Sequence, residues 1–343
     1  MMTEKEYKRI LIIEVNWLGD VLFSTPLIKA VRKRFKNAHI ACMTVPRCKE
    51  ILENNPNINE IIIYDEKGKH VSLLGKWRLI CELRKKHFDL AIILHRSFTR
   101  ALMAFLAGIT ERVGYDAKKR GFLLTKRVEF PDRELHKTEH FLKIAESLGC
   151  DTKEKACEFF VSDEDKKFIK GELSKAGIDD NDLIIVINPG GNWGPKRWDP
   201  VKFAKVSDRL IDKYRAKIIL SGAKKDIPLA EKIKNNMKNK PIIFTGRMDL
   251  KKLGALLERA NFVISGDSGP MHMAVALKTN VIALFGPTSP RLTGPFGDGN
   301  YEVIKKDVGC DVPCYDVTCG DYRCMNAVTV DDVIHVFEEM YGK

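Results

Sequence analysis

Residues 264–290 read ISGDSGPMHMAVALKTNVIALFGPTSP and contain two apolar runs, separated by a glycine-flanked acidic turn and a stretch with helical spacing. The apolar residues 262–265 and 281–285 predict buried strands, and residues 271–277 between them predict a helix. Strands that alternate with helices in this way form a parallel sheet with helices on both faces. This stretch therefore predicts a doubly wound α/β fold.

The same alternation of strand and helix occurs in two series along the chain. The expected strands lie at 9–14, 39–44, 61–64 and 90–94 in the first series, and at 183–188, 217–220, 242–244, 262–265 and 281–285 in the second. We therefore predict two Rossmann-like, doubly wound parallel-sheet domains, residues 1–160 and 161–343, that face each other across a ligand-binding cleft. The terminal helix, 330–341, belongs to the second domain or packs back on the first.

The charge of the chain is uneven between its halves. The 343 residues carry a net charge of +12. Residues 1–160 contain 30 Lys/Arg and 21 Asp/Glu, a net +9, which leaves +3 for residues 161–343. A basic half suits an anionic partner such as nucleic acid, a phospholipid surface or a phosphorylated glycan, although lysines on solvated helix faces would give the same imbalance. Because neither a membrane-spanning apolar stretch nor a signal-peptide pattern is present, we expect a cytoplasmic protein.

Four of the nine cysteines cluster near the C-terminus, at Cys310, Cys314, Cys319 and Cys324. An odd number of cysteines without a signal peptide argues against a secreted disulfide framework. A zinc site at these four positions is one interpretation, but the CxxC pairs typical of zinc sites are absent. We expect a structural loop with oxidisable cysteine pairs, and no cofactor.

The first predicted strand runs into Val15-Asn16-Trp17-Leu18-Gly19-Asp20, and a helix follows at once. Asp20 is expected either to cap this helix or to face the cleft, where it would take a proton from an attacking hydroxyl. The helix N-terminus would keep the carboxylate ionised. The GxGxxG fingerprint of dinucleotide-binding domains is absent after this strand.

The second domain opens with a loop that suits a diphosphate. Its first strand ends in Pro189-Gly190-Gly191-Asn192, which is followed by Lys196 and Arg197. Glycines let backbone N–H groups approach a phosphate, and the two cations complement its charge. The absence of GKS or GKT excludes a P-loop NTPase.

The Gly266–His272 turn combines an anion site with an acid. The N–H groups of Ser268 and Gly269 at the start of a helix can bind a phosphate. Asp267 is itself negative, so we expect it to accept hydrogen bonds from sugar hydroxyls. His272 either donates to a phosphate oxygen or fixes the turn. A carboxylate beside a diphosphate site indicates a nucleotide-sugar.

Asn16–Asp20, the segment 189–198 and the sequence GDSGPMH at 266–272 together resemble the ADP-heptose:lipopolysaccharide heptosyltransferases of glycosyltransferase family 9. The phrase RSFTRALMAFLAGITERVGY and the loop ending in Cys324-Met325 are more similar to the second heptosyltransferase than to the first. The resemblance implies a GT-B fold with the acceptor in the first domain and the nucleotide-sugar in the second. It also implies inverting transfer of a heptose from ADP-heptose to a hydroxyl of the lipopolysaccharide inner core.

The resemblance assigns roles to single residues. Asp20 matches the general base and Lys196 the phosphate-binding lysine, while Asp226 would hold the ribose and Met248 the adenine. The donor-binding residues expected from motif chemistry and resemblance are Gly190, Gly191, Asn192, Arg197, Asp226, Met248, Asp267, Ser268, Gly269 and His272. Relatives often carry a Thr or Ser pair at Gly191-Asn192 and a glutamate at Asp226, so the nucleotide of the donor stays open.

The basic first domain is expected to bind the acceptor. The cations assigned to phosphates or acidic sugars of a lipid-linked glycan are Arg96, Arg100, Lys118, Lys119 and Arg120. Their charge would favour peripheral contact with an anionic inner membrane. We expect a monomer that binds no nucleic acid and, because no DxD pair ends a strand, needs no divalent metal.

Three other functions fit the same fold. They are transfer of another nucleotide-sugar to a cell-envelope glycan, binding of a sugar ligand without catalysis, and epimerisation of a nucleotide-sugar. An epimerase would leave the basic first half unexplained, and a binding protein would have no use for Asp20 and Lys196.

Overall fold

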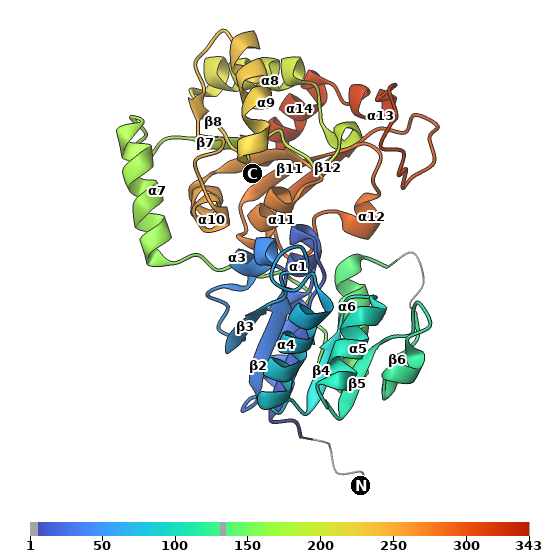
Figure 1. The fold of residues 1–343 in the computed structure, drawn as a ribbon. Coiled ribbons are helices and arrows are strands. Elements are labelled where there is room, and N and C mark those ends of the chain that lie inside the picture. Colours follow the sequence, from blue (N-terminus) through green and yellow to red (C-terminus); the bar gives the residue numbers. More distant parts are fainter. Residues whose placement is uncertain (1–5, 131–134, 343) are drawn as a thin grey trace. The chain divides into compact units, whose positions relative to one another are not determined.

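The computed structural model describes residues 6–130 and 135–342, and the chain divides into two compact units, Met1–Phe160 and Val161–Lys343 (Figure 1). Each unit contains one six-stranded parallel sheet with helices packed against it. This arrangement confirms the doubly wound α/β fold in both halves of the chain.

The first sheet has the strand order β3-β2-β1-β4-β5-β6. Its strands are β1 (Arg9–Ile13), β2 (His39–Thr44), β3 (Glu60–Ile63), β4 (Leu90–Ile93), β5 (Glu111–Tyr115) and β6 (Lys126–Val128). The helices of this unit are α1 (Leu18–Phe23), α2 (Thr25–Arg34), α3 (Lys49–Leu52), α4 (Leu73–Lys85), α5 (Phe98–Leu106) and α6 (Lys137–Glu146), with the 3-10 helices η1 (Pro46–Cys48) and η2 (Gly121–Leu123). The strand order reverses between β1 and β4, and such a switch point is where ligands of open α/β sheets bind.

The second sheet has the strand order β12-β11-β10-β7-β8-β9. Its strands are β7 (Ile184–Asn188), β8 (Lys217–Leu220), β9 (Ile242–Ile243), β10 (Phe262–Gly266), β11 (Asn280–Phe285) and β12 (Tyr301–Lys305). The helices of this unit are α7 (Asp163–Lys175), α8 (Pro200–Tyr214), α9 (Ile227–Asn236), α10 (Leu250–Arg259), α11 (Gly269–Ala276), α12 (Pro290–Thr293), α13 (Arg323–Asn326) and α14 (Val330–Tyr341), with η3 (Gly194–Lys196) and η4 (Lys224–Asp226). Here the switch point lies between β7 and β10.

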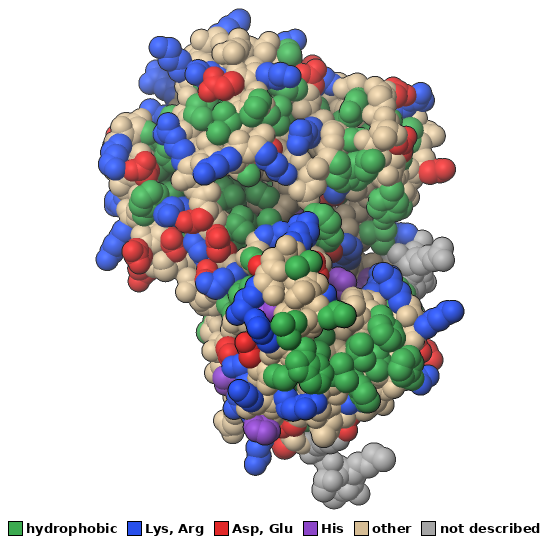
Figure 2. Space-filling view, in the orientation of Figure 1, with side chains coloured by type: hydrophobic (Ala, Val, Ile, Leu, Met, Phe, Trp, Pro, Cys, Tyr) green, Lys and Arg blue, Asp and Glu red, His purple; other side chains and the backbone are tan. Residues whose placement is uncertain are grey.

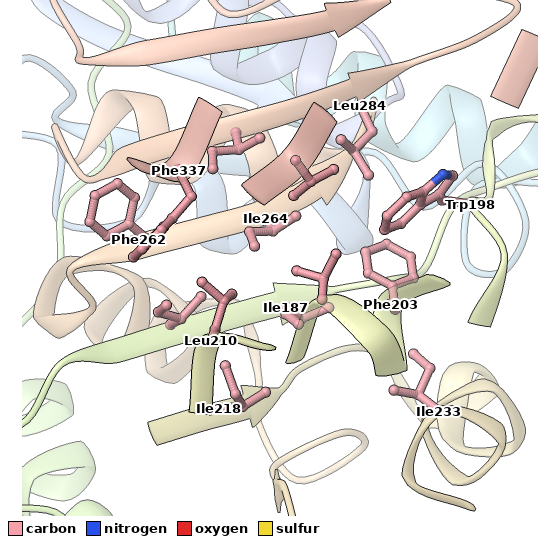
Figure 3. Close-up of a cluster of buried hydrophobic side chains, with 14 of the residues drawn as sticks. Ile187, Trp198, Phe203, Leu210, Ile218, Ile233, Phe262, Ile264, Leu284 and Phe337 are labelled. Atoms are coloured by element: carbon pink, nitrogen blue, oxygen red, sulfur yellow. The ribbon is translucent and has the colours of Figure 1, made fainter. Parts of the chain in front are cut away.

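Apolar strand residues supply the core of each unit. β4, β7 and β10 are buried along their whole length, as expected for strands covered on both faces. In the second unit Phe262 of β10 packs against Phe337 of α14 with ring centroids 4.7 Å apart (Figure 3). The terminal helix therefore packs on the second sheet, which corrects the alternative that it returns to the first domain.

The helix that the sequence predicts directly after the first strand is divided into α1 and α2 at Ser24. Pro26 lies in the first turn of α2 and has no N–H to donate to Leu22, so one continuous helix would lose a hydrogen bond there. Among the described residues, no helix is both long enough and apolar enough to span a membrane.

Candidate active site

The ends of β7 and β10 bring the two donor motifs together. The strands are parallel neighbours, with Asn188 opposite Ser265. Nδ2 of Asn188 donates to Oγ of Ser265 at 3.3 Å and to Oγ of Ser268 at 3.2 Å, and the two hydroxyl oxygens are 3.0 Å apart. These bonds hold the loop at 189–198 and the turn at 266–272 at one edge of the sheet.

Two glycines allow close approaches at this edge. A Cβ atom on Gly266 would lie 2.9 Å from the carbonyl oxygen of Lys196, and one on Gly190 would lie 2.8 Å from the Asp226 carboxylate. Both distances are shorter than real Cβ contacts, so a side chain at Gly266 would push the two loops apart and one at Gly190 would displace the Asp226 carboxylate.

Lys196 and Asp267 form an ion pair where the two motifs meet. Nζ of Lys196 lies 2.6 Å from Oδ2 of Asp267, and Nε2 of His272 lies 3.6 Å from Oδ1 of the same carboxylate. Asp267 and His272 are buried, and Nζ of Lys196 also lies 5.5 Å from the centroid of the Trp193 ring. The predicted phosphate-binding cation and the predicted sugar-binding acid thus face each other directly.

The charge of Asp267 is fixed by these neighbours. Burial by itself would raise the pKa of the carboxyl group, but the hydrogen bond from His272 and the charge of Lys196 outweigh burial and hold the pKa well below its ordinary value. At neutral pH Asp267 is therefore a pure hydrogen-bond acceptor. A ligand hydroxyl can donate to it, whereas a phosphate oxygen needs Lys196 as its partner.

Helix α11 starts inside the turn, with Ser268 at its N-cap and Gly269 as its first residue. The Ser268 side chain makes no capping hydrogen bond, because its hydroxyl group is bonded to Asn188 and Ser265. The side chain that most often satisfies a first-turn N–H group is thus engaged elsewhere. The Ser268 side chain therefore does not occupy the N–H groups at the start of α11, as the predicted binding of an anion by Ser268 and Gly269 requires.

Asp226 lies against Gly190 at the same edge of the sheet. Its Oδ2 atom accepts a hydrogen bond from the N–H group of Ala223 at 3.0 Å, whereas Oδ1 is buried and has no partner among the described residues. A buried acceptor without a donor costs free energy, which a ligand hydroxyl would offset. Met248 is half-buried in the segment between β9 and α10.

Lys196 and Arg197, which follow the glycines, make different contacts. Lys196 points to Asp267, whereas Arg197 is exposed and donates through Nη2 to the carbonyl oxygen of Gly191 at 2.9 Å. Trp198 is a core residue (Figure 3) whose Nε1 donates to the carbonyl oxygen of Val328 at 3.0 Å. Arg197 therefore closes the 191–197 loop, in which Asn192 is exposed.

Asp20 lies in the first turn of α1, at the carboxyl edge of the first sheet. The N-cap residue of α1 is Trp17, so Asp20 does not cap this helix. Its Oδ1 atom accepts a hydrogen bond from Nζ of Lys137 at 2.7 Å, and the side chain is 19% exposed. Lys137 was not predicted from the sequence, because it lies 117 residues away and belongs to no recognisable motif.

Arg100, which was expected to bind the acceptor, is buried instead of exposed. It is 2% exposed, and its guanidinium group donates to the carbonyl oxygen of Glu14, to Oδ1 of Asn16 and to Oε2 of Glu66. Nε of Arg47 donates to the carbonyl oxygen of Asn16 at 2.8 Å. Arg100 therefore fixes the loop that carries the chain from β1 to Asp20.

Arg120, also expected to bind the acceptor, is fully buried and donates to the carbonyl oxygens of His95, Ser97 and Tyr115. Burial lowers the pKa of its guanidinium group to about 10. Three of the predicted cations stay exposed, namely Arg96, Lys118 and Lys119. Of the five predicted acceptor residues, these three are therefore the ones whose side chains can meet a ligand.

Residues 76–319 match the family described as glycosyltransferase family 9 (heptosyltransferase). The chain belongs to this family. It is 28% identical over 301 residues to lipopolysaccharide heptosyltransferase 2 of Salmonella typhimurium, a match that covers 84% of this chain and 85% of that protein. It is also 29% identical over 307 residues to lipooligosaccharide heptosyltransferase 2 of Haemophilus influenzae, with 84% and 86% covered.

Solved structures support the family assignment. This glycosyltransferase superposes on the family 9 glycosyltransferase of Veillonella parvula with a TM-score of 0.92 and 27% identity, covering 98% of both chains. With the ADP-heptose lipopolysaccharide heptosyltransferase II of Escherichia coli the TM-score is 0.80 at 25% identity, covering 97% of this chain and 98% of that one. These matches confirm the GT-B fold that the resemblance implied.

Glu14 is a second acid of this glycosyltransferase that follows β1, and sequence reasoning missed it. The side chain is fully buried, and the hydroxyl group of Ser24 lies 3.0 Å from both carboxylate oxygens. Burial raises the pKa of Glu14 to about 8, against the hydrogen bond from Ser24 and the charge of Arg100. The side chain is therefore a neutral acid at pH 7.

Glu14 predicts a pH-dependent stability. Between the ordinary carboxyl pKa of 4.5 and the raised value of about 8, the folded protein holds a proton that the unfolded chain releases. The free energy of unfolding should therefore fall as pH rises through this window, by at most about 1.4 kcal/mol per pH unit. The Glu14→Gln variant has no group that titrates here, so its free energy of unfolding should not fall for this reason. In urea unfolding, its stability relative to the wild type should therefore rise from pH 5 to pH 8. If the free energies of unfolding of the two proteins changed in parallel with pH, Glu14 would be ionised in the folded protein as it is in the unfolded chain.

The four C-terminal cysteines line one small cavity of about 60 Å³, together with Pro195 and Tyr322. All four are free thiols. Within residues 6–130 and 135–342, no three His, Cys, Asp or Glu side chains are arranged to hold a metal ion. The cysteine loop borders the loop that carries Lys196, because a Cβ atom on Gly194 would lie 3.0 Å from the hydroxyl oxygen of Tyr322.

Proposed function

We propose that this family 9 glycosyltransferase moves a heptose from ADP-heptose to a hydroxyl of the lipopolysaccharide inner core. The observation that carries the proposal is the cluster of Lys196, Asp267 and His272 at the joint edge of β7 and β10. It offers one cation to a leaving diphosphate beside one carboxylate for sugar hydroxyls. The relatives named as heptosyltransferases support this choice of donor and acceptor.

The proposed reaction is one in-line displacement. Asp20 takes the proton of the acceptor hydroxyl while the hydroxyl oxygen bonds to the anomeric carbon of the heptose. The bond from that carbon to the diphosphate oxygen breaks on the opposite face, and ADP leaves with the bonding electrons. Lys196 and the N–H groups at the start of α11 stabilise the charge that develops on the diphosphate. We propose that these groups do the work of a divalent metal.

Each remaining residue has a place in the proposal. Asp226 would accept ribose hydroxyls through Oδ1, and Met248 would contact the adenine. Arg96, Lys118 and Lys119 would bind phosphates or acidic sugars of a lipid-linked acceptor. We further propose that the enzyme works as a monomer, at the cytoplasmic face of the inner membrane.

A transfer assay read by mass spectrometry tests the proposal. Purified enzyme is incubated with a panel of nucleotide-sugars, each combined with core acceptors truncated at successive sugars. The expected result is the mass of one added heptose, only with ADP-heptose and an inner-core acceptor. Addition of another sugar would favour transfer to a different envelope glycan, and conversion of a donor without any acceptor would favour an epimerase.

Asp267→Asn separates sugar recognition from diphosphate binding. The amide presents one acceptor oxygen where the carboxylate presents two, and it carries no charge, so transfer should fall about 10- to 100-fold. ADP affinity should hold or improve, because Lys196 is released from its ion pair. Calorimetry with ADP and the initial transfer rate measure the two effects. Asp249→Asn, the same change at the N-cap of α10, is the matched control. Equal losses in both measurements would place Asp267 in the diphosphate site instead.

A further inference from the structure

An apolar patch lies on the first turns of α4 and on the outer side of α5, and the proposed reaction makes no use of it (Figure 2). Leu73, Leu74 and Trp77 in the first turns of α4 are 85%, 59% and 48% exposed. The same face includes Phe98 and Phe105 of α5 and Phe122 of η2, which are 40%, 47% and 69% exposed. We call these six side chains the α4/α5 surface. A contiguous apolar patch on a protein surface marks a place of interaction.

The contacts between the elements make this one surface. Nη2 of Arg84 in α4 donates to the carbonyl oxygen of Leu106 in α5 at 2.6 Å. The rings of Phe98 and Phe122 lie with centroids 6.1 Å apart, which joins α5 to η2. Phe98, Leu102 and Phe105 recur at i, i+4 and i+7, so they follow one side of α5.

The charge around the surface is strongly positive. Residues 67–86 contain one acid, Glu82, and seven cations, Lys67, Lys69, Lys76, Arg78, Arg84, Lys85 and Lys86. Residues 101–110, which cover most of α5, contain no charged side chain. Leucine and aromatic side chains bordered by Lys and Arg are typical of helices that lie in the interface of an anionic bilayer. A second copy of this chain would bring the same positive charge and be repelled.

The α4/α5 surface begins at the same edge of the first sheet as Asp20. Helices α4 and α5 follow β3 and β4, so in this parallel sheet both begin at the carboxyl edge of the strands. Asp20 follows β1 and lies at that same edge. Leu73, Leu74 and Phe98, at the helix starts, are therefore on the end of the first unit that carries the general base.

We infer that the α4/α5 surface docks the enzyme on an anionic lipid bilayer, so that a lipid-linked acceptor reaches Asp20 from the membrane. The inference of docking depends only on the α4/α5 surface, whereas the inference that the acceptor is presented to Asp20 rests on the proposed function. Apolar side chains enter the headgroup region, and Lys67, Lys69, Arg78 and Lys85, all exposed, bind lipid phosphates.

Vesicle sedimentation without substrates tests the docking separately from the reaction. Vesicles of phosphatidylethanolamine with phosphatidylglycerol are compared with vesicles of phosphatidylcholine alone. The wild type should bind the anionic vesicles, and Leu73→Ser with Leu74→Ser should weaken binding about tenfold. Arg78→Glu with Lys85→Glu should weaken it to a similar extent. Phe168→Ser, at an exposed apolar side chain of the second unit, is the control and should bind as the wild type does.

Activity supplies the second readout. The Leu73→Ser/Leu74→Ser variant should keep the wild-type rate on a delipidated, water-soluble acceptor and lose rate on the same acceptor anchored in vesicles. Wild-type-like vesicle binding by this variant would overturn the inference. Equal binding of the wild type to neutral and anionic vesicles would overturn it too, as would a solution dimer that the variant dissociates. If no transfer occurs at all, the sedimentation result still decides whether this surface binds lipid.

Discussion

Replacing Asp20 with asparagine is expected to lower the transfer rate about 10²- to 10⁴-fold, while ADP binding is unchanged. Asparagine keeps the oxygen that accepts the hydrogen bond from Lys137, so the loop and α1 should stay in place. Its amide cannot take a proton from the acceptor hydroxyl. The rate constant at saturating substrate measures the first effect, and calorimetry with ADP measures the second.

Asp331→Asn is the matched control for this prediction. Asp331 is likewise an acid in the first turn of a helix, and it pairs with Arg209 on the outside of the second unit. The same chemical change there should leave the transfer rate within about twofold, as for most surface substitutions. Near-wild-type turnover by Asp20→Asn would show that another group is the base, and loss of ADP binding would show that Asp20 acts on the fold.

Lys196→Met is expected to weaken ADP binding about 10- to 100-fold, because a charge-assisted hydrogen bond to the diphosphate is lost. The transfer rate should fall further, by about 10²- to 10³-fold, since the charge on the leaving group grows in the transition state. The structure adds a second cause. Asp267 is buried against Lys196 at 2.6 Å, so the variant leaves a buried carboxylate that repels the diphosphate.

The double variant Lys196→Met/Asp267→Asn separates these two causes. Removing the uncompensated charge should recover part of the lost ADP affinity, whereas the transfer rate should stay low. Lys205→Met is the control, because Lys205 is an exposed lysine of α8. An unchanged ADP affinity in the single variant would remove Lys196 from the diphosphate site.

The fold could be predicted from the sequence where strands are central and buried. The apolar runs of β1, β7 and β10 are unambiguous because helices cover both faces of these strands. The strands β5, β6 and β12 were missed. They read ERVGY, KRV and YEVIK and lie at or near the sheet edges, where charged residues interrupt the apolar pattern.

The candidate site could be predicted in part. Strand order is enough to join the Lys196 loop to the Asp267 turn, because parallel neighbouring strands end at one edge. Local sequence cannot distinguish an exposed arginine from a buried one, and the burial of Arg100 and Arg120 was not predicted for that reason. Nor does any motif link Asp20 to Lys137, since only the packing of α6 against α1 brings them together.

The anomeric configuration of the product tests the central claim most directly. In the proposed reaction one displacement joins the acceptor hydroxyl to the heptose, with Asp20 as base and Lys196 at the leaving diphosphate. Nuclear magnetic resonance of the wild-type product formed from ADP-heptose should therefore show the configuration opposite to that of the donor. Retention of the donor configuration would require two displacements and would contradict the account.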